Sequence, residues 1–371
     1  MLQNSMAKKI PVILALIFLL AAVFSRGNSF SNTASAPFIG DSKAAFSADE
    51  RSTQDPILTA ISASAATPDE PALPDSSSEQ AAQPQTTAPP LVGDPVTEGY
   101  PSADIQNEPV VETVPATDKY VTLHLDAADI SRGNLILVNY ENSFDIPEDG
   151  DNVNIKSVKS ASYRVSDETM LLSASIIEPL NSMMDAFYEE SGRDAVTIRS
   201  AYRDYNLQQY IYNEYTRLVG PGAAAKWASL PGHSEHHTGM AFDLGIFSDG
   251  ELRVFTNTGV YSWFLKNSWQ YGFIQRYPDG KTEITKTVDE PWHFRYVGEP
   301  HAYIMLQNGW CFEEYIAMLR QNTQDDPFVY EYNGVTYTIF STTSADITVP
   351  ANCVCAVSGD NIDGFIVTLA G

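Results

Sequence analysis

A short polar segment near the middle of the chain combines residue types that bind metals. It reads PGHSEHHTGMAFDLG and covers residues 231–245. The alternation along MAFDLG predicts a strand, with Asp243 on one face between the very small Ala241 and Gly245, so that room remains beside the carboxylate. His236 precedes this strand. The histidine and the aspartate could share one divalent cation, although a simple hydrogen bond between them is an equally good interpretation.

A second polar segment, DEPWHFRYVG, covers residues 289–298 and supplies further candidates. Glu290 and His293 are three residues apart and would point to opposite faces of a straight strand. Pro291 interrupts the strand, and a bend there would bring both side chains to one site. Two histidines and one aspartate leave a coordination position open, as is typical of a catalytic zinc site. Zinc would lower the pKa of a bound water toward about 7, and Glu290 would accept the proton of that water.

The two segments together resemble the zinc D-Ala-D-Ala peptidases of the VanY and VanX types. The pattern of that family is S-x-H-x-x-G-x-A-x-D followed by E-x-W-H, and every fixed position is filled here. Upstream, residues 200–208 (SAYRDYNLQ) are similar to the S-G-Y-R segment of the family and its later glutamine, with Ala201 in place of the common glycine. The similarity covers roughly residues 118–322. The fixed positions are occupied by Ser234, His236, Gly239, Ala241, Asp243, Glu290, Trp292 and His293.

The resemblance implies a role for each matching residue. His236, Asp243 and His293 would bind one zinc ion, and Glu290 would be the general base. Arg203 would stabilise the tetrahedral oxyanion or the substrate. The implied reaction removes the terminal D-alanine from peptidoglycan stem peptides that end in D-Ala-D-Ala. The residues expected to hold the terminal peptide are Ser234, Gln208, Tyr202 and Trp292, although Trp292 could equally be a core aromatic residue.

The remaining histidines are expected to have other functions. His233 and His237 flank a predicted ligand and are interpreted as loop residues or as neighbours of the ligands. His301 is expected at the start of a helix and on the surface. His124 lies within a predicted strand and is interpreted as a structural residue.

Three alternative functions use the same residue types. Another peptidoglycan endopeptidase, of the L-Ala-D-Glu or L,D type, would carry the same ligands. A non-catalytic zinc module for binding the cell wall or a protein would resemble the Hedgehog-type domains, but it would not need the base Glu290. A non-haem iron oxygenase also uses two histidines and a carboxylate, and the E-P-W-H segment and an exported context argue against it.

The pattern of the remaining elements predicts an α+β fold. We expect a small antiparallel sheet with helices packed around the zinc site, as in the Hedgehog-like D,D-peptidases, in a domain covering residues 117–325. Residues 326–371 are expected to form a small β appendage, because FVYEYNGVTYTIF contains the hairpin dipeptide Asn333-Gly334. Strands are predicted at 120–126, 133–140, 195–200, 240–245 and 293–297. One helix is predicted over 170–188, where Pro179 kinks it or begins a second one, and another is marked by apolar residues from Leu207 to Leu218 and closed by Gly220-Pro221.

The N-terminal part is predicted to direct the protein out of the cytoplasm. Lys8 and Lys9 precede an apolar run over residues 10–24, which is typical of a signal peptide. As a helix the run would be roughly 22 Å long, which is short for the ~30 Å hydrocarbon core and favours a cleaved signal within residues 1–36 over a membrane anchor. Residues 37–116 are rich in Ser, Ala, Pro, Thr and acidic residues, and they predict a disordered linker that would extend the reach of the domain.

Composition limits the partners and the redox chemistry. The formal net charge of −25 over 371 residues argues against nucleic acid and anionic membrane surfaces as partners. Only an uncleaved N-terminal segment would contact a membrane, and we expect a monomer. Three cysteines are too few for a disulfide framework or a cysteine-rich zinc site, so they are interpreted as small hydrophobic residues. The predicted location is extracytoplasmic, at the bacterial cell wall.

Overall fold

A six-stranded sheet forms the centre of the fold. The structure is a computed structural model, and it describes residues 119–371. The strand order is β3-β5-β6-β9-β8, with β7 paired to β6. All pairs are antiparallel except β3 with β5, so the sheet is mixed and not purely antiparallel as predicted. The strands are β3 (Arg164–Val165), β5 (Val196–Ser200), β6 (Ala241–Ser248), β7 (Glu251–Val254), β8 (Phe273–Gln275) and β9 (His293–Tyr296).

The apolar face of strand β6 packs into the main hydrophobic core. Phe242 and Leu244 are fully buried there, and Met240 precedes them on the same face, as the alternation predicts. Helix α3 (Ile177–Ser191) contributes buried residues to this core at helical spacing. Because one face of β6 is used in this way, Asp243 is left on the opposite face of the sheet.

The helix predicted over 170–188 begins later than its apolar pattern suggests. Residues Leu171–Ser173 form strand β4, which pairs with β2 (Asn152–Asn154), and α3 starts at Ile177. Pro179 lies in the first turn of α3, where a missing backbone N–H costs nothing. The helix thus begins two residues before Pro179, and the preceding residues, which were expected to be helical, form β4 and a 3-10 turn at Ala174–Ile176. The remaining short helices of this part are α2 (Ile155–Val158), α6 (Ser262–Asn267) and α7 (Thr282–Thr285).

Residues 133–140 do not form the predicted strand, although residues 135–139 are buried. Leu135 and Leu137 belong to one hydrophobic cluster, whereas Ile136 and Val138 belong to another, so the alternation is real. The backbone of this segment bonds mostly outside any β-ladder: Leu135 N donates to Ser358 Oγ at 2.9 Å. The alternating pattern thus reflects a chain that lies between two cores.

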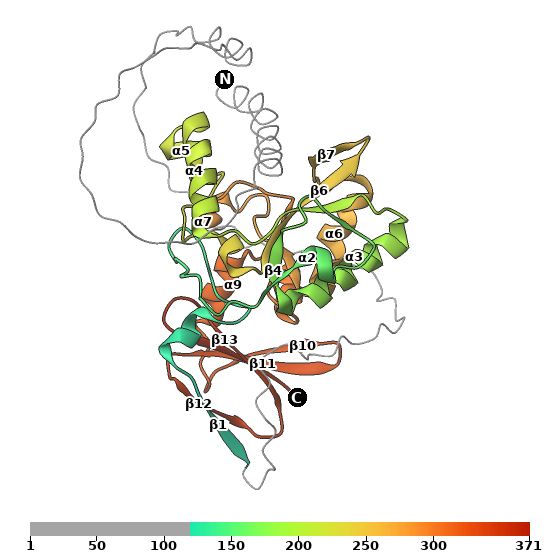
Figure 1. The fold of residues 1–371 in the computed structure, drawn as a ribbon. Coiled ribbons are helices and arrows are strands. Elements are labelled where there is room, and N and C mark those ends of the chain that lie inside the picture. Colours follow the sequence, from blue (N-terminus) through green and yellow to red (C-terminus); the bar gives the residue numbers. More distant parts are fainter. Residues whose placement is uncertain (1–118) are drawn as a thin grey trace, which may run out of the picture. The chain divides into compact units, whose positions relative to one another are not determined.

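Four further helices surround the sheet. Helix α4 (Tyr205–Val219) ends before Gly220 as predicted, and the short α5 (Pro221–Ala224) follows. Figure 1 shows α4 and α5 close together. Helices α8 (His301–Asn308) and α9 (Phe312–Leu319) pack into the second hydrophobic cluster.

The C-terminal residues form a four-stranded antiparallel sheet in the order β10-β11-β14-β13. Asn333 and Gly334 both have positive φ angles and close the predicted hairpin. Strand β12 (Asp346–Pro350) pairs with β1 (Tyr120–His124), so the first described strand lies beside the C-terminal part of the chain (Figure 1). The strands of the sheet are β10 (Phe328–Tyr332), β11 (Val335–Thr342), β13 (Val354–Gly359) and β14 (Phe365–Ala370).

Several predictions concern residues outside the described range. The proposed signal segment at 1–36 and the linker at 37–116 lie there. Within residues 119–371, no helix has the length and apolar character required to cross a membrane. The three cysteines all lie in the described part, and none of them belongs to a disulfide bond there.

Candidate active site

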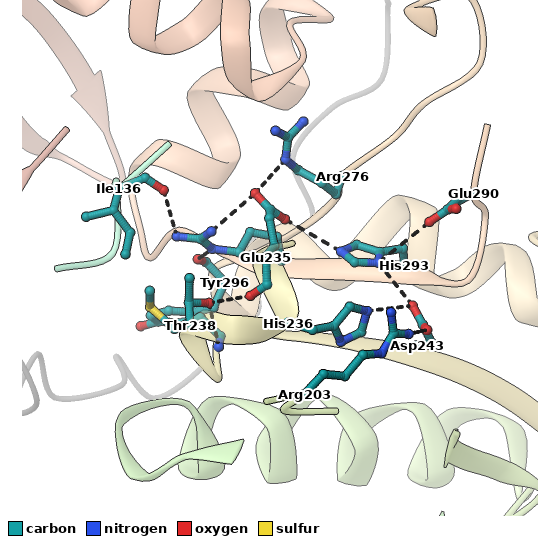
Figure 2. Close-up of polar contacts among 12 residues, drawn as sticks. Ile136, Arg203, Glu235, His236, Thr238, Asp243, Arg276, Glu290, His293 and Tyr296 are labelled. Atoms are coloured by element: carbon teal, nitrogen blue, oxygen red, sulfur yellow. Dashed lines mark hydrogen bonds and ion pairs between the residues drawn. The ribbon is translucent and has the colours of Figure 1, made fainter. Parts of the chain in front are cut away.

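Three predicted ligands converge on the face of the sheet opposite the main core. His236 lies in the 3-10 turn η4 (Glu235–Thr238), immediately before β6, and Asp243 lies within β6. His293 begins β9 and is the direct register partner of Asp243. Ligand atoms from the three residues lie within 4.8 Å of one another, and all three residues are buried. Figure 2 shows both imidazole rings directed at the carboxylate.

Hydrogen bonds determine which nitrogen of each histidine faces the centre of this group. His236 Nδ1 lies 2.7 Å from the carbonyl oxygen of Ala201, which leaves Nε2 directed at Asp243 Oδ1 at 3.5 Å. His293 instead presents Nδ1, which is 3.0 Å from the same oxygen. Asp243 Oδ1 is buried and has no hydrogen-bond partner. A buried carboxylate oxygen facing two imidazole nitrogens fits a divalent cation, and the N,N,O donor set suits zinc.

Burial and charge tune the two histidines in opposite directions. Burial, reinforced by the guanidinium of Arg203, lowers the pKa of His236 to about 4, which keeps its imidazole neutral as a metal ligand requires. Burial opposes the charged form of His293 as well, but the nearby carboxylates of Asp243 and Glu235 raise the pKa of His293 to about 9. A cation bound at this site would take the place of that proton.

Gly239 sets the path of the chain between His236 and Asp243. Its φ angle is +72°, in the left-handed region that favours glycine. A Cβ atom at this position would overlap the side-chain oxygen of Asn152 and lie 3.0 Å from the backbone nitrogen of Ser173. The turn therefore excludes any side chain.

Replacing Gly239 by alanine should lower the free energy of unfolding by at least about 2 kcal/mol, because the left-handed conformation costs roughly 1–2 kcal/mol and the overlap adds to it. Urea unfolding of the metal-free protein measures the loss. The matched control is Gly250→Ala: Gly250 also has a positive φ, +81°, but a Cβ there would meet nothing within 4 Å. Equal losses in the two variants would contradict the steric argument.

Glu290 approaches the same centre through the bend at Pro291. The backbone nitrogen of His293 donates to the carbonyl oxygen of Glu290 at 3.2 Å, which closes a tight turn. This turn brings Glu290 Oε2 to 3.6 Å from His293 Nδ1, as the sequence predicted. Burial, with the negative charge of Asp243 adding to it, raises the pKa of Glu290 to about 8. Burial therefore favours the protonated form of Glu290 while no cation is bound beside it.

Arg203 is held in place from three sides. Its Nη2 donates to Asp243 Oδ2 at 2.8 Å and its Nε donates to Ser200 Oγ at 2.9 Å. Its Nη1 donates to Gln208 Oε1 at 3.2 Å, and Gln208 in turn donates to the carbonyl oxygen of Ser229. Gln208 is fully buried and does not line the cleft, so this structure favours a role in orienting Arg203. Its predicted contact with the peptide stays a prediction.

An open cleft lies over the metal-ligand group. The predicted peptide-binding residues Ser234, Tyr202 and Trp292 all line it, together with Arg203 and Glu290. Trp292 also belongs to the main hydrophobic cluster, so it is a core aromatic residue as well as part of the cleft wall, and its contact with the peptide stays a prediction. The cleft is thus lined by Arg203 and Glu290, the two residues to which the resemblance assigns a part in catalysis.

The other histidines are placed away from the ligand group. His237 Nδ1 lies 2.7 Å from the carbonyl oxygen of Arg203, and its Nε2 accepts from Gly232 N. His233 Nδ1 contacts the carbonyl oxygen of Asn139. His301 does begin helix α8, but it is buried against Tyr315, so the expected surface position is wrong.

The buried charges behind the ligands were not predicted from the sequence. Glu235, Arg276 and Arg295 are all buried next to the metal-ligand group, and Arg199 is a further buried cation that lines the cleft. The available indication was the presence of arginines next to apolar residues, in FIQR at 273–276 and HFRY at 293–296. Such residues are rarely buried without a carboxylate partner.

Comparisons with known proteins agree with this geometry. The VanY family model, described as D-alanyl-D-alanine carboxypeptidase, matches residues 169–299. A D-alanyl-D-alanine carboxypeptidase of Enterococcus faecium is 32% identical over 246 residues, which cover 65% of this chain and 76% of that protein. One of Enterococcus faecalis is 34% identical over 205 residues, covering 52% of this chain and 68% of that protein. The solved structure of the vancomycin resistance D,D-dipeptidase VanXYg, in complex with a D-Ala-D-Ala phosphinate analog, is similar with a TM-score of 0.61 and 32% identity, covering 68% of this chain and 99% of that chain.

Proposed function

The chain belongs to the VanY family of D-alanyl-D-alanine carboxypeptidases, and we propose that it removes the terminal D-alanine from peptidoglycan stem peptides with one zinc ion bound to His236, Asp243 and His293. The observation that carries this proposal is the buried His-Asp-His group, which opens onto a cleft beside Glu290. VanXYg, the similar structure, holds a D-Ala-D-Ala phosphinate analog.

The proposed mechanism divides the work between the metal and two side chains. When bound, zinc would polarise the scissile carbonyl group and make a water molecule acidic enough to attack it near neutral pH. Glu290 would take the proton of that water and pass it to the amine of the departing D-alanine. The charge of a bound zinc ion would lower the pKa of Glu290 from its raised value in the metal-free site, so the carboxylate would be ionised when it takes the first proton.

Arg203 would stabilise the charge that develops on the peptide. Its guanidinium lines the cleft and is fixed by Ser200, Gln208 and Asp243. A donor that is already oriented does not have to reorganise when the tetrahedral oxyanion forms. The same cation could bind a substrate carboxylate, and either function requires it to stay charged.

The substrate should be recognised by its D-configured end. The purified protein should convert a stem pentapeptide ending in D-Ala-D-Ala to the tetrapeptide, with release of one D-alanine, and leave a peptide ending in L-Ala intact. Mass spectrometry of both mixtures measures this. EDTA should abolish cleavage and penicillin should not affect it, because residues 117–325 contain no S-x-x-K motif of the serine D,D-peptidases. Inhibition by penicillin without an effect of EDTA would refute the zinc mechanism.

The same assay separates the remaining alternatives for specificity. Cleavage between L-Ala and D-Glu, or of a tetrapeptide with an L,D terminal bond in preference to the pentapeptide, would identify a different peptidoglycan peptidase. We also propose that the chain acts outside the cytoplasm, and the support is the pair Lys8-Lys9 followed by the apolar run at 10–24. Intact cells that produce the full chain should therefore process a pentapeptide added to the medium, and activity only after lysis would contradict export.

A further inference from the structure

A buried carboxylate that belongs to neither the ligand set nor the proposed base lies behind His293. Glu235 is 1% exposed, and two fully buried arginines share its Oε1 atom. Arg276 Nε donates to this oxygen at 2.7 Å, and Arg295 Nη1 donates to it at 3.2 Å. Figure 2 shows Glu235 between Arg276 and His293.

The second oxygen of Glu235 faces the metal ligand. Glu235 Oε2 lies 3.5 Å from His293 Nε2. Both atoms are buried, and neither has a hydrogen-bond partner at standard distance. His293 meets the ligand group through its other nitrogen, Nδ1. The imidazole therefore bridges the carboxylate of Asp243 on one side and the carboxylate of Glu235 on the other.

The two arginines are in turn fixed by partners on other elements. Arg276 donates two hydrogen bonds to Glu313 of helix α9, at 2.9 Å and 2.8 Å. Arg295 donates to the carbonyl oxygens of Asn134 and Ile136 in the segment 133–140, and to that of Tyr296. Two cations and two carboxylates thus balance in charge. Because moving these four charged side chains out of water costs free energy, the group adds little to the free energy of unfolding in comparison with apolar packing.

We propose that Glu235 is a positioning residue for the metal ligand His293. As an acceptor, Glu235 holds the proton of the neutral imidazole on Nε2, and this leaves the lone pair of Nδ1 directed at the metal. Arg276 and Arg295 keep Glu235 ionised and in place. Carboxylates that orient metal-binding histidines typically change metal affinity by 10–100-fold. The inference rests on the proposed zinc site, and the competing explanation is that Glu235 only neutralises the two arginines.

Replacing Glu235 by glutamine tests the difference. Glutamine has the same shape, and its amide oxygen can still accept from Arg276 and Arg295, which places the NH2 group opposite His293 Nε2. Two donors would then face each other, so the tautomer with the proton on Nδ1 would be favoured and the lone pair lost. We expect the Kd for zinc, measured by competition with a chromophoric chelator, to rise about 10–100-fold.

Glu313→Gln is the matched control. It removes one negative charge beside the same arginine, Arg276, but the side chain of Glu313 hydrogen-bonds to Arg276 and Asn139 and not to His293. This variant should keep its zinc affinity within about threefold of the wild type, while both variants lose thermal stability in the metal-free state. Equal zinc affinities in the two variants would overturn the proposal. Failure of the wild-type protein itself to bind zinc would instead refute the proposed function.

A measurement on the unmodified chain covers the case in which Glu235→Gln does not fold. Nitrogen NMR of the zinc-loaded protein, with labelled histidine, should show two metal-bound rings of opposite tautomer. His236 should carry its proton on Nδ1, where it faces the carbonyl oxygen of Ala201, and His293 should carry an exchange-protected proton on Nε2. A proton on Nδ1 of His293, or rapid exchange of the Nε2 proton with solvent, would overturn the proposal.

Discussion

Replacing Glu290 by glutamine should slow turnover of the D-Ala-D-Ala pentapeptide at least about a hundredfold without loss of zinc. Removing a general base typically costs 10²–10⁴ in rate, or roughly 3–5 kcal/mol of barrier. The three ligand residues are untouched, so the metal should remain at about one ion per chain. Glu290→Asp should also be slow, because a side chain shorter by one methylene group withdraws the carboxylate from the water. The measurement is kcat and zinc content on the same samples.

The neighbouring carboxylate supplies the control. Asp289 is exposed, accepts a hydrogen bond from Gln275 at 3.1 Å and does not line the cleft. Asp289→Asn changes the charge by the same amount one residue away, and it should turn over at a near-normal rate. Similar rates for the two variants would show that Glu290 is not the base. If the Glu290→Gln variant is slow and has also lost its zinc, Glu290 is a metal ligand. In this structure its Oε2 atom lies 3.6 Å from His293 Nδ1.

The main features of the site follow from short patterns in the sequence. Alternation along β6 predicts that Asp243 leaves the apolar face, and the structure confirms it because Phe242 and Leu244 fill the core. The proline bend predicts that Glu290 and His293 meet, and the turn hydrogen bond between them explains how. These features were predictable because each depends on residues only a few positions apart.

Other features depend on partners far along the chain. The segment at 133–140 has the alternation of a strand, but its backbone bonds to Ser358 and Asp360, which a local pattern cannot reveal. The helix-starting His301 is buried because Tyr315 and Thr368 surround its ring. In each case burial between two packed layers decides the outcome, and local propensity is overridden.

Glu235 illustrates the same limit within the site. It occupies a variable position of the family pattern, directly before a ligand, and nothing in its neighbours distinguishes it from a surface glutamate. Its partners Arg276 and Arg295 are 41 and 60 residues away. Only the folded chain brings these charges together, and the sequence by itself indicates no more than two arginines beside apolar residues.

Loss of the two histidine ligands should abolish zinc binding. A variant with both His236→Ala and His293→Ala keeps only Asp243 of the predicted set, and one carboxylate cannot compete with water for the ion at micromolar concentrations. The purified wild-type protein should contain about one zinc per chain, and the double variant close to none. Metal analysis by mass spectrometry decides this, and full retention of zinc would refute the assignment of the site.

The same variant separates metal binding from folding. Zinc at about 100 times its Kd should stabilise the wild-type protein by about 2.7 kcal/mol, which corresponds to a rise in Tm of roughly 5–10 °C for a domain of this size. The double variant should show no rise. The control is His237→Asn, because His237 is as buried as His236 and adjacent to it, but its nitrogens face backbone groups. This control should lose some stability and still respond to zinc; a zinc-independent Tm in it would extend the ligand set to His237.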